Sequence, residues 1–364
     1  MAISKKKTLV GLDIGSHCIK LVEIVHSKRG RVLQNFGVIH TPPGAVVEGS
    51  IKDQEGVASA IKTLYRNLRV RNSNVAVSLP GYSVISKKIS LVKMEEAKVE
   101  SAIQEEAEKY IPYDINEVNL DFAVLDTGGT SDATGEENET SKDSRQMEVL
   151  LVAAKREVID EYVQLIQAAD LNPGVLDADL FALQNAAEIS LLNPEPCYAI
   201  INLGAAELEI NVVTRGISTF SRDSSYGGAQ VTDAIKAEFN IDLLEAEKMK
   251  LGGAELDDQK EEGLAKIVNH EVSGWIKEIK RALDFVSGTR AGDPIKKIIV
   301  SGGSCKTPGL QKYLELETGI PVEPLNPFRN LVVDYNRFDV DYLDYMALQA
   351  GVAVGLSLRS IDDK

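Results

Sequence analysis

Five residues in the stretch VGLDIGSHCIKLVEI, near the start of the chain, combine groups that bind phosphate and a divalent cation. Gly15 lets the main chain approach a ligand closely, and the N–H groups of Ser16 and His17 can donate to an anion. The Asp13 carboxylate suits Mg²⁺ held through water, since hard cations prefer oxygen ligands, and Lys20 can pair with phosphate. Asp-x-Gly is also common in tight hairpin turns, because Gly accepts positive φ and Asp bonds its own backbone. The stretch alone leaves both interpretations open.

A second stretch, AIINLGAAELEINVV at residues 199–213, repeats this arrangement. It has an apolar strand, Asn-Leu-Gly in place of Asp-Ile-Gly, small residues and a second apolar strand. A third glycine turn, in KIIVSGGSCKTPGL, lies between a strand and a helix. Internal duplication of this kind predicts two similar domains around a cleft. The ordered series of glycine turns favours the phosphate interpretation.

The elements that position these turns alternate between strands and helices, which predicts an α/β protein. Apolar runs predict strands, helical spacing of apolar residues predicts helices, and Pro112 ends one helix. The expected strands are residues 9–14, 19–25, 32–41, 74–81, 118–126 and 147–155, and the expected helices are residues 53–68, 94–111, 157–171 and 226–241. Two further helices, 178–189 and 346–359, carry the small residues Ala182, Ala186, Ala187, Gly351 and Gly355 and are expected to cross between the halves.

The segment 127–146, TGGTSDATGEENETSKDSRQ, is polar, acidic and rich in Gly, Ser and Thr. It lies between two expected strands, so it is predicted to be a long, mobile hairpin loop. A role as an interaction loop and a role as a plain solvated insertion both remain open.

Composition excludes several classes of protein. The 364 residues are 44% hydrophobic and 26% charged, as in an ordinary globular protein, and the formal net charge is −15. Such a surface repels nucleic acid and anionic lipid. The lysine-rich first residues are followed by an apolar run that Asp13 interrupts, so neither a signal peptide nor a membrane span is predicted. A cytoplasmic protein without direct membrane insertion is expected.

The cysteine and histidine spacing predicts no disulfide framework and no zinc site. The three cysteines are far apart and form no CxxC pair, and the four histidines are likewise scattered along the sequence: Cys18, Cys197, Cys305, His17, His26, His40 and His270. The cysteines are expected to be small, partly buried hydrophobic residues.

The order GLDIGSHCIK, INLGAAELEI, SGGSCKTPGL resembles the phosphate-1, phosphate-2 and adenosine motifs of the actin/Hsp70/sugar-kinase ATPase superfamily. Within it the chain is most similar to the PilM family of type IV pilus assembly proteins, which is related to the cell-division protein FtsA. The segments that carry this likeness are EEAEKYIPYDINEVNLDF, VLLVAAKREVIDEYV, DADLFALQNAAE and SYGGAQVTDAIKAEFNIDLLEAEKMK. The resemblance covers nearly the whole chain, apart from the acidic segment.

The resemblance implies an actin-like ATPase fold, with two similar domains around a nucleotide cleft and an FtsA/PilM-type inserted subdomain. The expected boundaries are 1–82 with 176–201 and 344–364 for domain I, 202–343 for domain II, and 83–175 for the insertion. ATP and Mg²⁺ are the implied ligands. Asp13 would hold Mg²⁺ through water, and the expected nucleotide-binding residues are Gly15, Ser16, His17, Lys20, Asn202, Gly204, Ala205, Gly227, Gly228, Glu247, Lys250, Gly302 and Gly303. Glu247 and Lys250 share one helix face, which suits ribose contacts, and an ordinary surface ion pair is the other interpretation.

The catalytic residues depart from the superfamily pattern at one position, because Asn202 stands where the superfamily usually has Asp. An amide keeps the hydrogen bonds but can neither act as a base nor neutralise a metal ion. Asp13 and Asp179 remain as catalytic candidates, so nucleotide binding is expected to outlast hydrolysis, which would be weak or absent. The alternative is that Asn202 is a harmless variant and that hydrolysis proceeds from Asp13 and Asp179.

The implied partners are the short N-terminal cytoplasmic peptide of an inner-membrane PilN-like protein and other inner-membrane pilus proteins. The inserted subdomain would contribute to peptide binding, by main-chain pairing and side-chain pockets. FtsA typically ends in an amphipathic membrane helix, whereas this chain ends in the short acidic GLSLRSIDDK. Membrane contact is therefore expected to come through a partner. An active ATPase, a small-molecule kinase of the superfamily and an FtsA-like cell-division protein are the alternatives.

Overall fold

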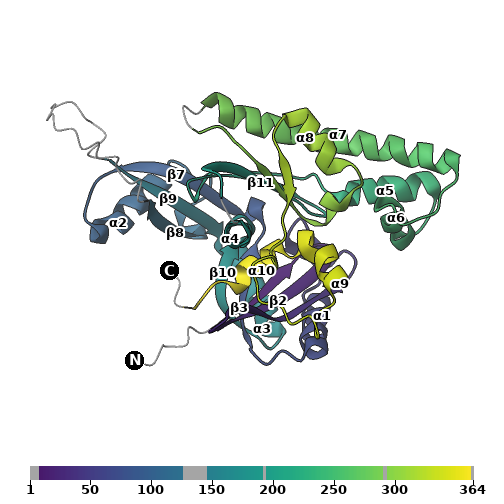
Figure 1. Cartoon of the computed structure of the whole chain (residues 1–364). Coiled ribbons are helices and arrows are strands. Elements are labelled where there is room, and N and C mark those ends of the chain that lie inside the picture. Colours follow the sequence, from purple (N-terminus) through teal and green to yellow (C-terminus); the bar gives the residue numbers. More distant parts are fainter. Residues whose placement is uncertain (1–7, 126–145, 192–193, 290–292, 362–364) are drawn as a thin grey trace. The chain divides into compact units, whose positions relative to one another are not determined.

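A computed structural model describes residues 8–125, 146–191, 194–289 and 293–361, and Figure 1 shows the whole chain. The chain divides into two compact units. The larger unit comprises Met1–Gly81 and Glu161–Lys364, and the smaller unit comprises Tyr82–Asp160. Most of the acidic segment 127–146 lies outside the described residues.

Two five-stranded sheets organise the larger unit, and they have the same topology. The first has the order β10-β6-β1-β2-β3 and the second the order β13-β12-β11-β14-β15. In each, three strands form an antiparallel meander and two more continue in parallel from its first strand. The strands of the first sheet are β1 Val10–Ile14, β2 Cys18–Ser27, β3 Gly30–His40, β6 Asn74–Leu79 and β10 Asn172–Ala178. Those of the second are β11 Cys197–Leu203, β12 Leu208–Thr214, β13 Ile217–Ser224, β14 Ile298–Ser301 and β15 Val322–Pro324.

This shared topology confirms the internal duplication that the repeated turns predict. β1 and β11 are apolar and almost entirely buried, as expected for central strands that are covered on both faces. Two of the expected domain boundaries fall inside strands. The boundary at 201/202 lies within β11, all of which belongs to the second sheet, and the boundary at 175/176 lies within β10, all of which belongs to the first. A small two-stranded sheet, β4 Val46–Val47 and β5 Ser50–Ile51, follows β3.

Helices flank the sheets. They are α1 Gln54–Leu68, α3 Arg156–Ala168, α4 Asp179–Ser190, α5 Gly228–Phe239, α6 Leu243–Lys250, α7 Asp258–Thr289, α8 Leu310–Thr318, α9 Val340–Met346 and α10 Gly351–Ser357. The long helix α7 (Figure 1) packs its apolar face against the second sheet, and Trp275 on that face is fully buried in the shared core. Within the described residues, no helix combines the length and apolarity that a membrane span requires.

The expected crossing helices pack closely, as their small residues predict. A Cβ at Gly355 of α10 would lie 1.6 Å from the carbonyl oxygen of Ala182 in α4, so only glycine fits there. The core around this crossing also contains Tyr198 and Ile200 of β11, and hence joins α4 and α10 to the second sheet. The second helix is shorter than the expected 346–359, because a 3₁₀ turn at Ala347–Gln349 interrupts it.

The smaller unit is a three-stranded antiparallel sheet with one covering helix. The strands β7 Val84–Val92, β8 Val118–Leu125 and β9 Gln146–Lys155 have the order β7-β9-β8. The helix α2 spans Glu96–Ala107, and its Val99 and Ile103 share a core with the sheet. It ends earlier than residue 111, ahead of Pro112, which disfavours helical geometry in the residue before it.

Candidate functional site

The first hairpin places an ion pair beside its turn. Asp13 and Lys20 are cross-strand partners in β1 and β2, and Lys20 Nζ lies 3.0 Å from Asp13 Oδ2. The two side chains are only 15% and 12% exposed for Lys20 and Asp13. Burial alone would lower the pKa of Lys20, but the Asp13 carboxylate outweighs burial and raises that pKa above its ordinary value. Lys20 therefore remains a cation next to the predicted phosphate position.

Hydrogen bonds fix the turn itself. The Gly15 N–H donates to the Cys18 carbonyl at 3.1 Å, and the Thr41 hydroxyl donates to the Gly15 carbonyl at 2.7 Å. The Thr41 N–H also donates to the His17 carbonyl at 3.0 Å. The end of β3 thus holds the turn that carries Ser16, so the turn is rigid before any ligand arrives.

The second hairpin has the same register but different chemistry. Asn202 and Glu209 are cross-strand partners in β11 and β12, and Asn202 Nδ2 donates to Glu209 Oε2 at 3.4 Å. Glu209 in turn lies opposite Asp223 of β13. Burial, followed by repulsion from Asp179, Asp223 and Glu207, raises the pKa of Glu209 well above its ordinary value. Burial likewise raises the pKa of Asp223 to about 6.

Asp179 adds a further acid from the first residue of α4. The Ser78 hydroxyl of β6 donates to its Oδ1. Burial and then the charge of Asp13 raise the pKa of Asp179 to about 7. The charge of Asp13 acts on Asp179, and the charge of Asp179 acts on Glu209, so these acids lie within electrostatic reach of one another. Such a group of buried carboxyls must either hold protons or be neutralised by a cation.

The second glycine turn packs against the start of α5. The N–H groups of Gly228 and Ala229 donate to the carbonyls of Gly204 and Ala205, at 3.0 and 2.8 Å. A Cβ at Gly227 would lie 2.2 Å from the Ala205 carbonyl oxygen, which explains the glycine. The turn and the helix N-terminus therefore form one continuous backbone surface.

Glu247 and Lys250 form a buried ion pair that holds α6 onto α5. Lys250 Nζ donates to Glu247 Oε1 at 2.7 Å, to the Thr232 hydroxyl at 2.9 Å and to the Gly228 carbonyl at 3.2 Å. Burial would raise the pKa of Glu247, but Lys250 outweighs burial and lowers it. The pair is thus an internal connection close to the second glycine turn.

The third glycine turn lies between β14 and a short 3₁₀ helix, Gly303–Lys306. Gly302 has φ +95°, and a Cβ there would lie 2.2 Å from the Leu203 carbonyl oxygen. The Ser304 hydroxyl donates to the Gly204 carbonyl at 2.7 Å. These contacts connect the third turn to the second, as expected for parts of one site.

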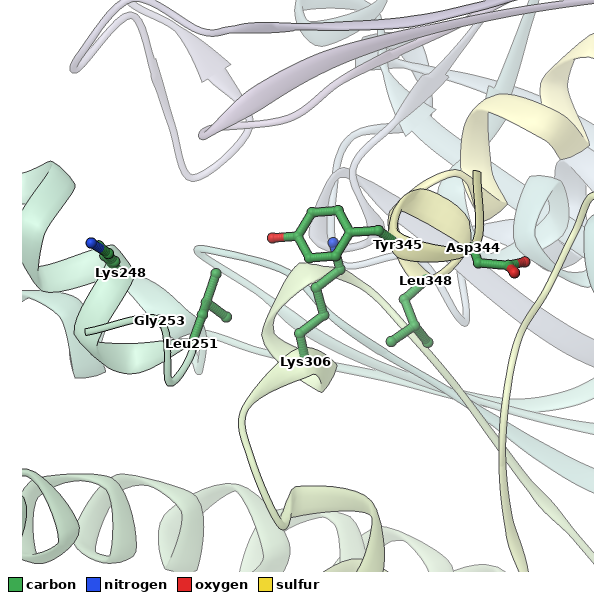
Figure 2. Close-up of a pocket in the computed structure, with 7 residues that line it drawn as sticks. All are labelled: Lys248, Leu251, Gly253, Lys306, Asp344, Tyr345 and Leu348. Carbon is green, nitrogen blue, oxygen red and sulfur yellow. The ribbon is translucent and has the colours of Figure 1, made fainter. Parts of the chain in front are cut away.

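A cavity of about 560 Å³ opens beside the end of α6, the 3₁₀ helix that follows the third glycine turn, and α9. It is lined by Lys248, Leu251, Gly253, Lys306, Asp344, Tyr345 and Leu348, which Figure 2 shows. Lys306 Nζ lies 3.4 Å from the centre of the Tyr345 ring, and within the described part of the chain it has no hydrogen-bond partner. Burial lowers the pKa of Lys306 to about 8.

Comparison with known proteins identifies the family. The family described as type IV pilus assembly protein PilM matches residues 11–361. The chain belongs to this family.

Solved structures agree with that result. The structure of a PilM–PilN type IV pilus biogenesis complex is similar with a TM-score of 0.83 and 29% identity, covering 98% of this chain and 100% of that one. MreB5 of Spiroplasma citri, bound to AMPPNP, is similar with a TM-score of 0.52 and 12% identity, covering 97% of this chain and 95% of that one. The predicted actin-like fold is confirmed.

A curated relative is more distant. The ethanolamine utilization protein EutJ of Salmonella typhimurium is 25% identical over 154 residues, which are 41% of this chain and 46% of that protein. The chain thus spans about half the length of the curated relatives it matches.

The site of this PilM-family protein also contains residues that the sequence analysis did not single out. Glu209 interrupts the largely apolar strand β12, and that interruption is a signal visible in the sequence, whereas Asp223 lies in the polar strand β13 and gives no such signal. Lys306 and Tyr345 carried no such signal, because nearly 40 residues separate them and only the fold brings them together.

Proposed function

We propose that this protein is a nucleotide-binding scaffold of the type IV pilus assembly machine, which binds ATP with Mg²⁺ in the cleft between the two sheets. The single observation that carries the proposal is the pair of matching hairpins, each of which has a buried carboxyl beside its turn, Asp13 in the first and Glu209 in the second. MreB5 of Spiroplasma citri, which shares the fold, is described with bound AMPPNP.

The carboxyl cluster fits a divalent cation. Glu209 Oε1 and Asp223 Oδ1 are buried and have no hydrogen-bond partner within the described residues. Hard oxygen donors are the ligands Mg²⁺ prefers, and Mg²⁺ usually retains several waters. Asp13 and Asp179 would hold the ion through water, and the ion would neutralise phosphate charge. Lys20, held as a cation, would contact a phosphate from the first turn.

The base and ribose would occupy the cavity of Figure 2 and its margin near Glu247 and Gly302. Apolar area is supplied by Leu251, Leu348 and the Tyr345 ring, which suits a flat base. Lys306 would exchange its contact with the ring for an acceptor on the nucleotide. Hydrolysis would be slow, because Asn202 cannot act as a base.

Calorimetry with Mg²⁺ and ATP on the full chain tests this part of the proposal. The Asp13→Ala variant should bind the Mg²⁺–nucleotide more weakly, whereas Asp170→Ala, which removes an exposed acid, should bind as the wild type does. Absence of adenine-nucleotide binding by the wild type at millimolar concentration would contradict the proposal that the cleft binds nucleotide.

The partner would be the N-terminal cytoplasmic peptide of a PilN-like inner-membrane protein, since a similar solved structure is a PilM–PilN complex. This contact would place the protein on the cytoplasmic side of the inner membrane, together with other pilus proteins. We propose the Tyr82–Asp160 unit as part of the binding surface. In the described sheet, β7 and β8 are the outer strands, and an extended peptide can pair with such an edge.

Fluorescence anisotropy with a labelled PilN N-terminal peptide tests the partner. A charge at an exposed position of an outer strand, Val92→Asp in β7 or Val124→Asp in β8, should weaken binding. Val47→Asp, exposed in the larger unit, is the matched control and should have no effect. Unchanged peptide affinity in both test variants would move the peptide site elsewhere and leave the nucleotide proposal intact.

A further inference from the structure

Three metal-ligating side chains converge at the open end of the β2–β3 pair. They are His17, Cys18 and His40, and one ligand atom from each lies within 4.8 Å of the others. Their sequence spacing gives no sign of a site, because 22 residues separate Cys18 from His40. The strand register brings the two residues together, because Cys18 begins β2, His40 ends β3, and the two are direct cross-strand partners.

The backbone holds this cluster in place without any help from a ligand. The Thr41 N–H donates to the His17 carbonyl at 3.0 Å, which ties the residue before β2 to the residue after β3. The two imidazole rings meet edge to face, with centroids 5.3 Å apart. Cys18 Sγ lies 3.7 Å from His40 Nδ1.

The distance between Cys18 Sγ and His40 Nδ1 is close to the one expected around a tetrahedral transition-metal ion. With Zn–S of about 2.3 Å and Zn–N of about 2.0–2.1 Å, tetrahedral angles place sulfur and nitrogen roughly 3.5 Å apart. We propose that His17, Cys18 and His40 form a site for a first-row transition cation, with Zn²⁺ as the best fit and the fourth position open to water. One thiolate and two imidazoles exclude Mg²⁺, which takes oxygen ligands, so this site differs from the carboxyl cluster.

The surroundings do not oppose a dication. The charged groups that act on Cys18 and His17 are three lysines and two carboxylates, Lys20, Lys250, Lys306, Asp13 and Glu247, and a Cys18 thiolate would balance the remaining positive charge. Cys18 is buried and His40 is exposed, so a cation can enter from the solvent on the histidine side and reach the sulfur. A bound ion would tie the turn that carries Ser16 to the end of β3.

Metal titration of the purified full chain tests the site, with no nucleotide present. Zn²⁺ is titrated by calorimetry, and Co²⁺ is titrated as a spectroscopic probe whose charge-transfer absorption reports a thiolate ligand. The wild type should bind one ion and show the thiolate band. His40→Ala should weaken Zn²⁺ binding on the order of 100-fold, and Cys18→Ser should abolish the Co²⁺ band.

The matched control is His26→Ala, because His26 is an exposed histidine of the same strand β2 and lies outside the cluster. It should bind Zn²⁺ as the wild type does. His40 is exposed, so its loss should leave the fold intact, which far-ultraviolet circular dichroism checks. Absence of a thiolate band in the wild type, or wild-type Zn²⁺ affinity in His40→Ala, would overturn the proposal.

Discussion

The two hairpins have the same backbone arrangement, but their paired side chains differ in charge. In the first, Asp13 faces Lys20, and in the second, Asn202 faces Glu209, with the same separation along the chain. The first pair is a short ion pair and keeps both charges. In the second, the acid has no cation opposite it, and burial raises its pKa instead. A duplicated fold therefore supplies two equivalent positions, and side-chain charge distinguishes them: the first holds a compensated ion pair, whereas the acid of the second needs a proton or a metal ion.

The largest expected effect comes from giving the second hairpin the charge of the first. Asn202→Asp introduces a carboxylate that can position Mg²⁺ or water, and a positioned base typically adds about 10²–10⁴-fold in rate. We expect single-turnover ATP hydrolysis to rise by at least about 100-fold. Asp13→Asn in the same background should remove the gain. A wild type that already turns over near one per second would contradict the scaffold interpretation.

Removing the cation of the first hairpin should have the next largest effect. Lys20→Met deletes the proposed phosphate contact and leaves Asp13 buried without its partner, so Mg²⁺–ATP affinity should fall about 100-fold. The double variant Asp13→Asn/Lys20→Met should be more stable to urea than Lys20→Met alone, because no unpaired charge remains. Lys62→Met removes a half-exposed pair and serves as the control. Equal stability of the single and double variants would show that the charges of Asp13 and Lys20 do not contribute to stability through each other.

The acid at the start of α4 sets a pH dependence. The pKa of Asp179 is about 7 in the folded protein and about 4 in the unfolded chain, so the folded state holds an extra proton between these values. Stability therefore decreases as the pH rises from 4 to 7. Asp179→Asn still accepts the Ser78 hydrogen bond and should gain up to about 4 kcal/mol relative to the wild type above pH 7, measured by urea unfolding. Asp170→Asn, an exposed position, should show no such gain.

The smallest expected effect concerns Lys306. Its pKa of about 8 means that its charge is lost as the pH rises through 8, so nucleotide affinity should fall by roughly 10-fold from pH 7 to 9.5. Lys306→Met should bind more weakly at pH 7 and lose this dependence, as followed by calorimetry. Lys248 lines the same cavity, and the Lys248→Met variant should keep the pH dependence of nucleotide affinity.

Local patterns in the sequence were sufficient to predict the duplicated hairpins, the crossing helices and the glycine turns. They were sufficient because a turn or a helix face depends on residues close together in the chain. The contacts of Lys306 with Tyr345 and of Cys18 with His40 depend on register and on packing between distant segments. The raised pKa of Glu209 depends on burial, which periodicity indicates only coarsely. The roles predicted for individual site residues stay predictions.

The contact between Gly355 and Ala182 has a mechanical consequence. At this crossing of α10 and α4, the main chain of Gly355 touches the main chain of Ala182, with no side chain between them. α4 also touches strands of both sheets. Because the two main chains meet at this point without an intervening rotamer, Gly355 forms a fixed pivot between the helices. A ligand that turned α4 about this pivot would therefore move strands of both sheets together.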